Sequence, residues 1–143
     1  MKISTRTRYG MRAILELALA YGAGPVQIKT IAERQNISVK YLEQLIAIIK
    51  TAGLVRSIRG PHGGYVLAKP PQDIKLSDIF RSLEGSVFTV ECVENKDACE
   101  RYADCVTRRL WTEVNDAILN VLENKTLQDL VEMAEKEKLN YQI

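Results

Sequence analysis

The segment from residue 27 to residue 67 constrains the fold more than any other part of the sequence. Apolar residues at helical spacing predict a short helix over 27–35 and a longer helix over 39–51. The connection between them is tight, because Asn36 is among the few residue types that tolerate a positive φ and Ser38 is a good N-cap. Two short helices joined in this way predict a helix-turn-helix.

A hairpin is expected directly after the second of these helices. Gly53 is placed to end the helix, and residues 54–67 alternate in polarity on either side of a glycine-rich turn at 60–64. We therefore predict a mainly α fold, a winged helix-turn-helix with a two-stranded wing and a long C-terminal dimerisation helix. A phosphate-binding loop is the other interpretation of the glycines, but no Gly-Lys-Ser or Gly-Lys-Thr follows and no helix begins behind them.

Charge is divided unevenly along the chain. The 143 residues carry a net charge of only +2, yet residues 1–70 hold eleven Lys or Arg against three Glu, a balance of +8, and residues 71–143 have a balance of −6. A basic half favours a polyanionic partner, usually nucleic acid, over the alternative of a solvated basic surface without a partner. We expect residues 1–70 to form the DNA-binding domain and residues 71–143 to carry a cysteine loop and dimerisation helices.

The polar face of the helix over 39–51 supplies candidate DNA contacts. Glu43 is unusual there, because a carboxylate beside phosphates is unfavourable unless it accepts a hydrogen bond from cytosine N4 in the major groove. The alternative is a weak pair with Lys40 in the same helix. Cations in the wing suit a phosphate backbone or a narrow minor groove. The candidate DNA-binding residues are Ser38, Lys40, Tyr41, Glu43, Gln44 and Arg59, with Arg56 beside Arg59 in the wing.

All three cysteines of the chain, Cys92, Cys99 and Cys105, fall within fourteen residues. Six residues separate the first pair and five the second, too many for a C-x-x-C knuckle but few enough for three thiolates to converge on one centre. An odd number argues against a closed disulfide framework, which leaves metal binding, a reactive thiol, redox sensing or three unrelated cysteines. A nucleophilic enzyme is the weakest alternative, because the only histidine, His62, lies in the wing, and we expect no enzymatic activity.

The second half of the chain predicts three further helices. Residues 76–85 are expected to form a short helix with Ser77 as its cap. Residues 107–122 predict a longer helix whose apolar stripe is wide enough to pack against the same helix of a second copy, which indicates a homodimer. The four residues from Thr126 resemble a capping box that starts a last helix, before a tail that we expect to fray over 139–143.

Nothing in the sequence indicates a membrane partner. No run approaches eighteen apolar residues, and the first eight residues are mostly polar. We therefore expect a cytoplasmic protein.

Four motifs together resemble a known family. They are Tyr41-Leu-Glu-Gln-Leu45, Gly53-Leu-Val55, the wing sequence Arg59-Gly-Pro-His-Gly-Gly-Tyr65 and the cysteine triplet. In combination these motifs are similar to the Rrf-two family of bacterial winged-helix regulators, and most of all to its branch of iron-sulfur cluster regulators, typified by IscR. The resemblance covers nearly the whole chain. It implies a homodimer that binds palindromic, double-stranded promoter DNA and whose DNA contacts depend on an iron-sulfur cluster.

The resemblance also implies a ligand set. Cys92, Cys99 and Cys105 would ligate a [2Fe-2S] cluster that senses the state of cluster biogenesis, and Glu43 would filter promoter sequences. The usual fourth ligand of this branch is a histidine where this chain has Arg108, which cannot coordinate iron. Nitric-oxide sensors of the family use an N-terminal carboxylate where this chain has Arg8. Candidates for the fourth ligand are a small thiol, water, or the carboxylates of Glu91, Glu94, Asp97, Glu100 and Asp104.

The alternatives keep the fold and change the signal. One fills the cysteine site with zinc, a second makes the cysteines redox-active in a protein that binds another protein, and others sense nitric oxide or sulfur status. A cluster, a zinc ion and metal-free thiols differ in colour and in metal content.

Overall fold

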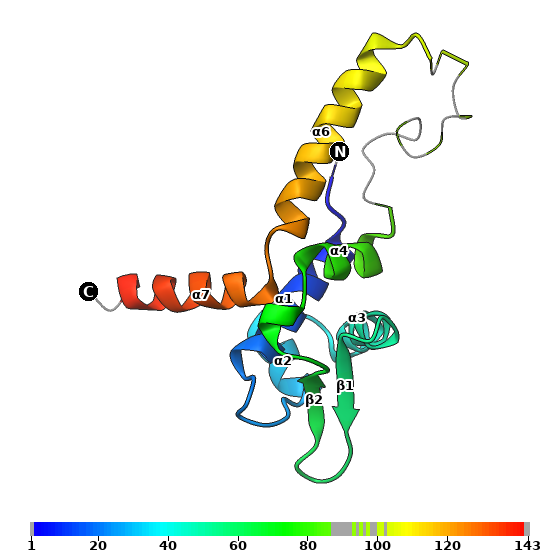
Figure 1. Cartoon of the computed structure of the whole chain (residues 1–143). Coiled ribbons are helices and arrows are strands. Elements are labelled where there is room, and N and C mark those ends of the chain that lie inside the picture. The colour runs from blue at the N-terminus through cyan, green and yellow to red at the C-terminus, as the bar shows by residue number, and fades with distance from the viewer. Residues whose placement is uncertain are drawn as a thin grey trace.

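The winged helix-turn-helix predicted from the sequence is confirmed in the computed structural model, which describes residues 2–86, 93, 95, 97, 100, 101 and 103–141 (Figure 1). In chain order the elements are α1 (Thr5–Leu19), α2 (Ile28–Gln35), α3 (Val39–Thr51), β1 (Val55–Ile58), β2 (Gly64–Leu67), the 3-10 turn η1 (Pro71–Asp73), α4 (Leu76–Glu84), α6 (Val106–Glu123) and α7 (Leu127–Tyr141). In Figure 1 the hairpin of β1 and β2 extends downward from the helices, while α6 and α7, the last two helices of the chain, extend away from the other helices.

The turn between α2 and α3 forms as its residues predict. Asn36 ends α2 in the left-handed conformation with φ 54° and ψ 49°. Ser38 is the N-cap of α3, and its Oγ accepts a hydrogen bond of 3.1 Å from the backbone N–H of Tyr41. Gly53 follows the helix with a φ of 80°, the left-handed conformation that glycine adopts without a steric penalty. The local chemistry of these residues therefore sets where α3 begins and ends.

The wing is an antiparallel pair of strands extended by one further residue. Val55 pairs with Leu67 and Arg56 with Val66, so Val55 and Leu67 face the core. On the other edge of β2, Val26 exchanges two backbone hydrogen bonds with Tyr65, of 3.0 and 2.9 Å. A Cβ on the neighbouring Gly64 would lie 2.4 Å from the backbone oxygen of Val26, so only glycine permits this close approach.

One hydrophobic core crosses the division expected at residue 70. Helix α1 lies at its centre and packs against α2, α3, α4, α7 and β2. Gly10 of α1 lies against Leu83 of α4, where a Cβ would come within 2.6 Å of the leucine side chain, which allows the two helices to approach closely. The buried residues with no exposed surface are Ala13, Ile14, Ile31, Leu42, Ile49, Ile74, Ile79 and Leu127, drawn from both halves of the chain.

Two predicted helix ends are wrong. Ser77 does not cap α4, because the helix begins at Leu76 and Ser77 is buried inside it. Backbone pairing takes the place of a side-chain cap: the N–H of Leu76 donates to the carbonyl of Lys125 (3.0 Å), and Lys75 bridges to Thr126. The tail expected to fray over 139–143 instead continues α7 through Tyr141.

One half of the capping box expected at the start of α7 forms, while the backbone N–H of Asp129 donates to the carbonyl of Thr126 (3.1 Å) and not to its hydroxyl. The carboxylate of Asp129 accepts a hydrogen bond of 2.8 Å from the backbone N–H of Thr126. The same segment pairs with the residues before α4, since the N–H of Leu127 donates to the carbonyl of Ile74 at 2.9 Å. The α6–α7 connection is thereby fixed to the base of α4.

A carboxylate joins the end of α4 to the start of α1. Glu84 accepts hydrogen bonds from the hydroxyl of Thr7, from the hydroxyl of Ser4 (2.8 Å) and from the backbone N–H of Ser4 (3.2 Å). The bond from Thr7, followed by those from Ser4, lowers the pKa of the Glu84 carboxyl against the opposing effect of burial. The ionised form of Glu84 is therefore a fixed part of the contact between the two helices.

This contact makes stability depend on pH in a defined direction. A carboxyl whose pKa is lower in the folded state stabilises it above its unfolded pKa, about 4.3 for Glu, and that contribution is lost as the pH falls through the lowered value. We expect Thr7→Val to reduce the free energy of unfolding at pH 7 by about 1–2 kcal/mol, as for a lost hydrogen bond to a charged group. Urea titrations should show the difference from wild type narrowing as the pH falls below about 4.

The matched control is Thr5→Val, because the Thr5 hydroxyl accepts only from the exposed Arg8 at 3.2 Å and has no bond to Glu84. A Thr7→Val deficit that stays constant from neutral to acidic pH would show that Glu84 does not use this bond.

Candidate nucleic-acid interface and cysteine site

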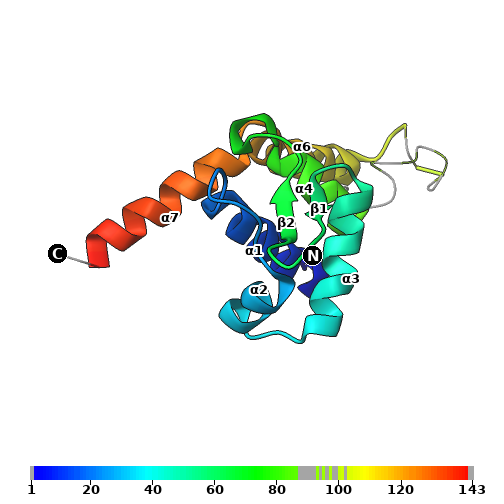
Figure 2. The same ribbon diagram turned by 90° about the horizontal axis from the view of Figure 1, so that it is seen from below.

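Helix α3 separates an apolar face from a polar one. Its buried face is formed by Leu42, Leu45, Ile46 and Ile49, none more than 1% exposed. The hairpin of β1 and β2 lies beside it, and α3 borders the molecule on that side (Figure 2). The opposite face exposes four of the sequence-predicted residues, which are Ser38, Lys40, Glu43 and Gln44.

Glu43 is not paired with Lys40. Between side chains that the structure describes, the ion pairs are Arg34 with Glu16 and Arg81 with Glu123. The alternative explanation of Glu43 as half of an intrahelical pair is therefore not supported. Its carboxylate is exposed on the polar face of α3.

Tyr41 differs from its neighbours because it is half-buried against α1. Its ring meets the ring of Tyr9 edge to face, with centroids 6.3 Å apart and an interplanar angle of 83°. The guanidinium carbon of Arg12 lies 5.3 Å from the centroid of the same Tyr9 ring. Neither Tyr9 nor Arg12 is among the DNA-binding residues predicted from the sequence, although their spacing of three places them on one face of α1.

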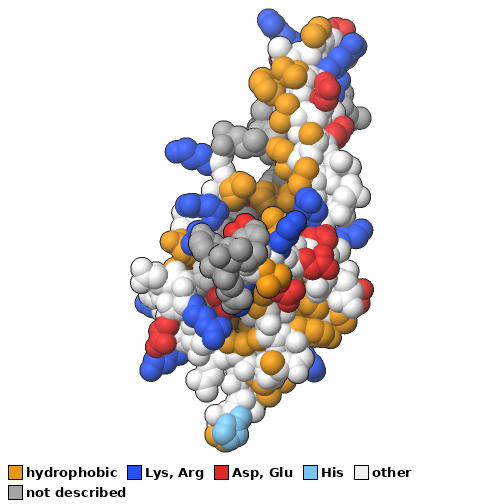
Figure 3. Space-filling model, turned by 90° about the vertical axis from the view of Figure 1, so that its left-hand side faces the viewer, with side chains coloured by type: hydrophobic (Ala, Val, Ile, Leu, Met, Phe, Trp, Pro, Cys, Tyr) orange, Lys and Arg blue, Asp and Glu red, His pale blue; other side chains and the backbone are white. Residues whose placement is uncertain are grey.

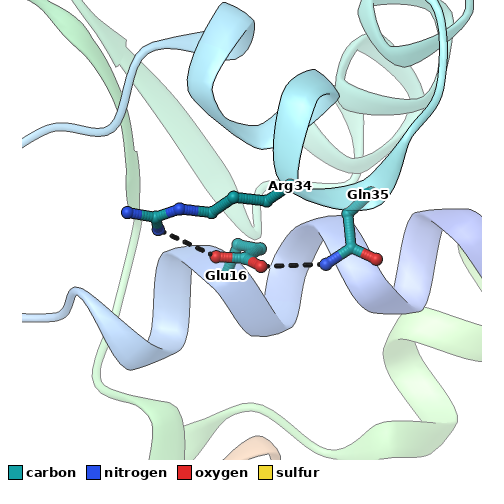
Figure 4. A network of polar contacts seen from close by, with 3 residues as sticks. All are labelled: Glu16, Arg34 and Gln35. Atoms are coloured by element: carbon teal, nitrogen blue, oxygen red, sulfur yellow. Dashed lines mark hydrogen bonds and ion pairs between the residues drawn. The ribbon is translucent and has the colours of Figure 1, made fainter.

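A second contact holds the helix-turn-helix against α1. Glu16 of α1 accepts one hydrogen bond from Arg34 (3.1 Å) and one from Gln35 (2.8 Å), both in the last turn of α2 (Figure 4). Gln35 is the last residue before the left-handed Asn36. Glu16 therefore fixes the end of α2 where the chain turns toward α3.

The wing is tied to the other end of α3. The ammonium group of Lys50 donates a hydrogen bond of 3.2 Å to the hydroxyl of Ser57 in β1. Arg56 and Arg59 are exposed, as is His62 near the tip. The interface thus has a polar helix face with cations along the adjoining hairpin.

Of the three cysteines, only Cys105 lies within the described residues, as do Asp97, Glu100 and Asp104 among the carboxylates; Cys92, Cys99, Glu91 and Glu94 lie outside them. In the described part of the chain no three His, Cys, Asp or Glu side chains converge as a metal site requires. Convergence of the three cysteines therefore stays a prediction from the sequence.

Cys105 occupies the N-cap position of α6. Its sulfur lies 3.2 Å from the hydroxyl of Thr107, and this hydrogen bond, followed by one from the backbone N–H of Arg108, lowers the pKa of the thiol. The positive charge of Arg108 acts in the same direction. The thiolate is the form that binds metals and reacts with oxidants, so this position favours both kinds of chemistry.

Helix α6 carries an apolar stripe that the described part of the chain leaves uncovered. Among its 18 residues only Asn115 is buried. Figure 3 shows hydrophobic side chains running along the length of the helix. The most exposed are Val106 (74%), Val121 (53%), Leu110 (50%) and Trp111 (40%). None of the described helices is long and apolar enough to cross a membrane.

Comparison with known proteins finds one family over nearly the whole chain. A family model described as "Rrf2: Iron-dependent Transcriptional regulator" matches residues 3–133. The regulator CymR of Bacillus subtilis is 43% identical over 141 residues, which cover 99% of this chain and 97% of CymR. The regulator IscR of Escherichia coli is 39% identical over 131 residues, which cover 92% of this chain and 80% of IscR.

Solved structures give the same result. The structure titled "the Global Cysteine Regulator of B. subtilis", which is CymR, matches with a TM-score of 0.81 and 44% identity, covering 93% of this chain and 98% of that one. The IscR of T. potens matches with a TM-score of 0.79 and 43% identity, covering 96% and 90%. The closer likeness to the IscR branch that we expected is therefore not found, since CymR is at least as similar.

The exposed Glu43 gives a testable consequence for base selection. We expect Glu43→Ala to relax discrimination at one base pair in each half-site, on the order of tenfold, because the acceptor for a cytosine amino group is lost. Selection of binding sites from a random duplex library measures this directly.

Glu33→Ala is the control, because Glu33 is an equally exposed carboxylate on α2, outside α3. An unchanged base preference in Glu43→Ala would remove Glu43 from the set of base-contacting residues.

Proposed function

The chain belongs to the Rrf2 (Rrf-two) family of transcriptional regulators, DNA-binding proteins that are not enzymes. From that premise we propose that it acts in the cytoplasm as a homodimer on palindromic promoter DNA, and that an iron-sulfur cluster held by Cys92, Cys99 and Cys105 controls its DNA contacts. Ser38, Lys40, Tyr41, Glu43 and Gln44 would face the major groove, and Arg59 would enter the flanking minor groove.

The observation that carries this proposal is the position of Cys105. A thiol with a lowered pKa at the start of α6 suits a cluster ligand, and two further cysteines precede it within fourteen residues. When bound, a [2Fe-2S] cluster would supply a redox-active centre whose stability reports iron and sulfur supply. Arg108, three residues later, stays protonated and supplies no ligand. A carboxylate such as Asp97, Glu100 or Asp104, or a small thiol, would complete the set.

The location of the cysteine segment explains how it would affect DNA binding. It joins α4, which packs against α1 and α3, to α6. Ligation would hold three points of this connection together and so bias the position of α6 relative to α3. In a dimer formed through α6, that position sets the distance between the two DNA-reading helices, which must match the spacing of the half-sites.

A second candidate function is sensing of sulfur status without a cluster. It is favoured by the 43–44% identity to CymR, whose structure is titled as that of a global cysteine regulator. The lowered pKa of Cys105 also suits a thiol that reacts directly with an oxidant or a sulfur compound.

Anaerobic purification separates the two candidates. We expect coloured protein with visible absorption and a Mössbauer spectrum of a two-iron cluster, and we expect Cys92→Ala, Cys99→Ala and Cys105→Ala each to lose most of the bound iron, because each removes one ligand. Asp97→Asn, Glu100→Gln and Asp104→Asn form the matched series that tests for the fourth ligand.

Colourless protein that contains zinc would indicate a zinc site in the same fold. Colourless, metal-free protein that still binds promoter DNA would instead favour the sulfur-status candidate.

The exposed stripe of α6 provides a separate test of the dimer. An apolar face of this kind on an otherwise polar helix is typical of helix pairing, and the i, i+4 spacing of Val106, Leu110, Val114 and Ile118 gives it a continuous seam. We expect Leu110→Lys to convert the dimer to a monomer, because a charge in this seam would be desolvated without a partner. Sedimentation velocity measures the change.

Asp116→Lys is the control, because Asp116 is exposed on α6 away from this seam and the substitution places a lysine there too, with a charge change of +2 instead of +1. A dimer that survives Leu110→Lys would mean that α6 is not the dimer contact.

A further inference from the structure

Three residues on the outer face of α1 lie along the border with the helix-turn-helix. Tyr9, Arg12 and Glu16 follow at intervals of three and four, so they share one face of the helix. Glu16 holds the end of α2 through Arg34, and Tyr9 contacts Tyr41 in the first turn of α3. Arg12 lies between these two contacts along α1.

Arg12 is a fixed cation without an acidic partner. It is exposed, and neither of the ion pairs between described side chains includes it. Its guanidinium instead lies over the Tyr9 ring at 5.3 Å, an arrangement that restricts the side chain while leaving its N–H donors available. By contrast, Arg34 and Arg81 are each 3.1 Å from a carboxylate.

The two flanks of α3 show where Arg12 lies relative to the DNA-reading face. Tyr41 marks one flank, where it meets Tyr9 of α1. Lys50 marks the other, where it is bonded to Ser57 of the wing. Nine positions along a helix correspond to a rotation of about 180°, so these two residues lie on opposite flanks. Arg12 therefore lies on the side of α3 away from the wing.

A helix in the major groove has a phosphate backbone on each side. The wing carries Arg56 and Arg59 toward one of them. We propose that Arg12 binds a phosphate of the opposite backbone, and that Tyr9 is the positioning residue that holds both the Arg12 guanidinium and the Tyr41 ring. The proposal rests on the DNA binding described above and adds a contact from α1 to the residues of α3 and the wing.

The dependence of DNA affinity on salt tests this contact. The logarithm of the association constant falls as the logarithm of the salt concentration rises, and each phosphate contact makes this slope steeper by about 0.9. Arg12→Gln should therefore make the slope shallower by about 1 for each half-site. The measurement is fluorescence anisotropy of the full chain on two duplexes of about 30 base pairs, one selected by the wild type from a random library and one of mixed sequence. Because phosphate contacts carry no sequence information, the slope should fall on both duplexes.

Arg81→Gln is the matched control, because Arg81 is an exposed arginine on α4 that pairs with Glu123. Its slope should equal that of the wild type. An unchanged slope in Arg12→Gln overturns the proposal, whether or not the affinity falls. A lower affinity with the wild-type slope would show only an indirect effect through folding. A wild type that binds neither duplex would overturn the DNA-binding function itself, and with it any role of Arg12.

Tyr9 is tested by a pair of variants. Tyr9→Phe keeps the ring face and edge and should retain the wild-type slope and base preference. Tyr9→Leu removes the ring, and should lower the slope toward that of Arg12→Gln while also weakening selection of the preferred palindrome through Tyr41. Tyr9→Leu with the wild-type slope would show that Arg12 does not depend on the ring.

Discussion

Apolar packing against α1 holds the other elements of the winged helix in place. Five elements pack against this helix, and its inner residues Ala13, Ile14, Leu17 and Ala18 are almost entirely shielded from solvent. Full burial of a leucine or isoleucine side chain such as Leu17 or Ile14 stabilises the fold by about 1.5–3 kcal/mol. The outer face of the same helix then orients the helix-turn-helix, through Glu16 at the end of α2 and Tyr9 at the start of α3. One helix thus supplies both the core and the alignment of the candidate interface.

The cysteine segment, residues 92–105, lies between α4 and α6. At one end Glu84 joins α4 to the first turn of α1, and at the other Cys105 begins α6. The hydrophobic core is one continuous cluster of buried residues, whereas α6 buries only Asn115 among its 18 residues. A ligand held by the cysteines would therefore act on the least buried helix rather than on the core. In the proposed function this difference allows the signal to move α6 without unfolding the winged helix.

Local chemistry explains why much of the fold could be predicted from the sequence. Asn36, Ser38, Gly53 and the hairpin at 54–67 act through their own backbone preferences, so their positions in the structure match the prediction. The cap predicted at Ser77 is wrong because pairing of Leu76 with Lys125, 49 residues later in the chain, decides how α4 begins. The Tyr9–Tyr41 contact was missed for a similar reason, since it depends on how two helices cross. For the candidate site, the sequence predicts the exposed face of α3 and shows the spacing of the cysteines. It does not predict whether the three cysteines converge, because that depends on how the chain folds between them. Which signal the protein senses, an iron-sulfur cluster or sulfur status, depends on the chemistry of the cysteine site. Overall similarity does not distinguish the two, because the chain resembles both CymR and IscR.

In the proposed function the state of the cysteine site controls DNA binding, which a comparison of DNA affinities with and without the cluster tests. The affinity for the selected palindromic duplex is measured anaerobically for the protein with its cluster and for the same preparation after the cluster is removed. We expect the two dissociation constants to differ by about 5-fold or more, the usual range of coupling between two sites. We also expect Cys105→Ala to show a single value under both treatments. Equal affinities of the wild type with and without the cluster would mean that the cysteine site does not control DNA binding.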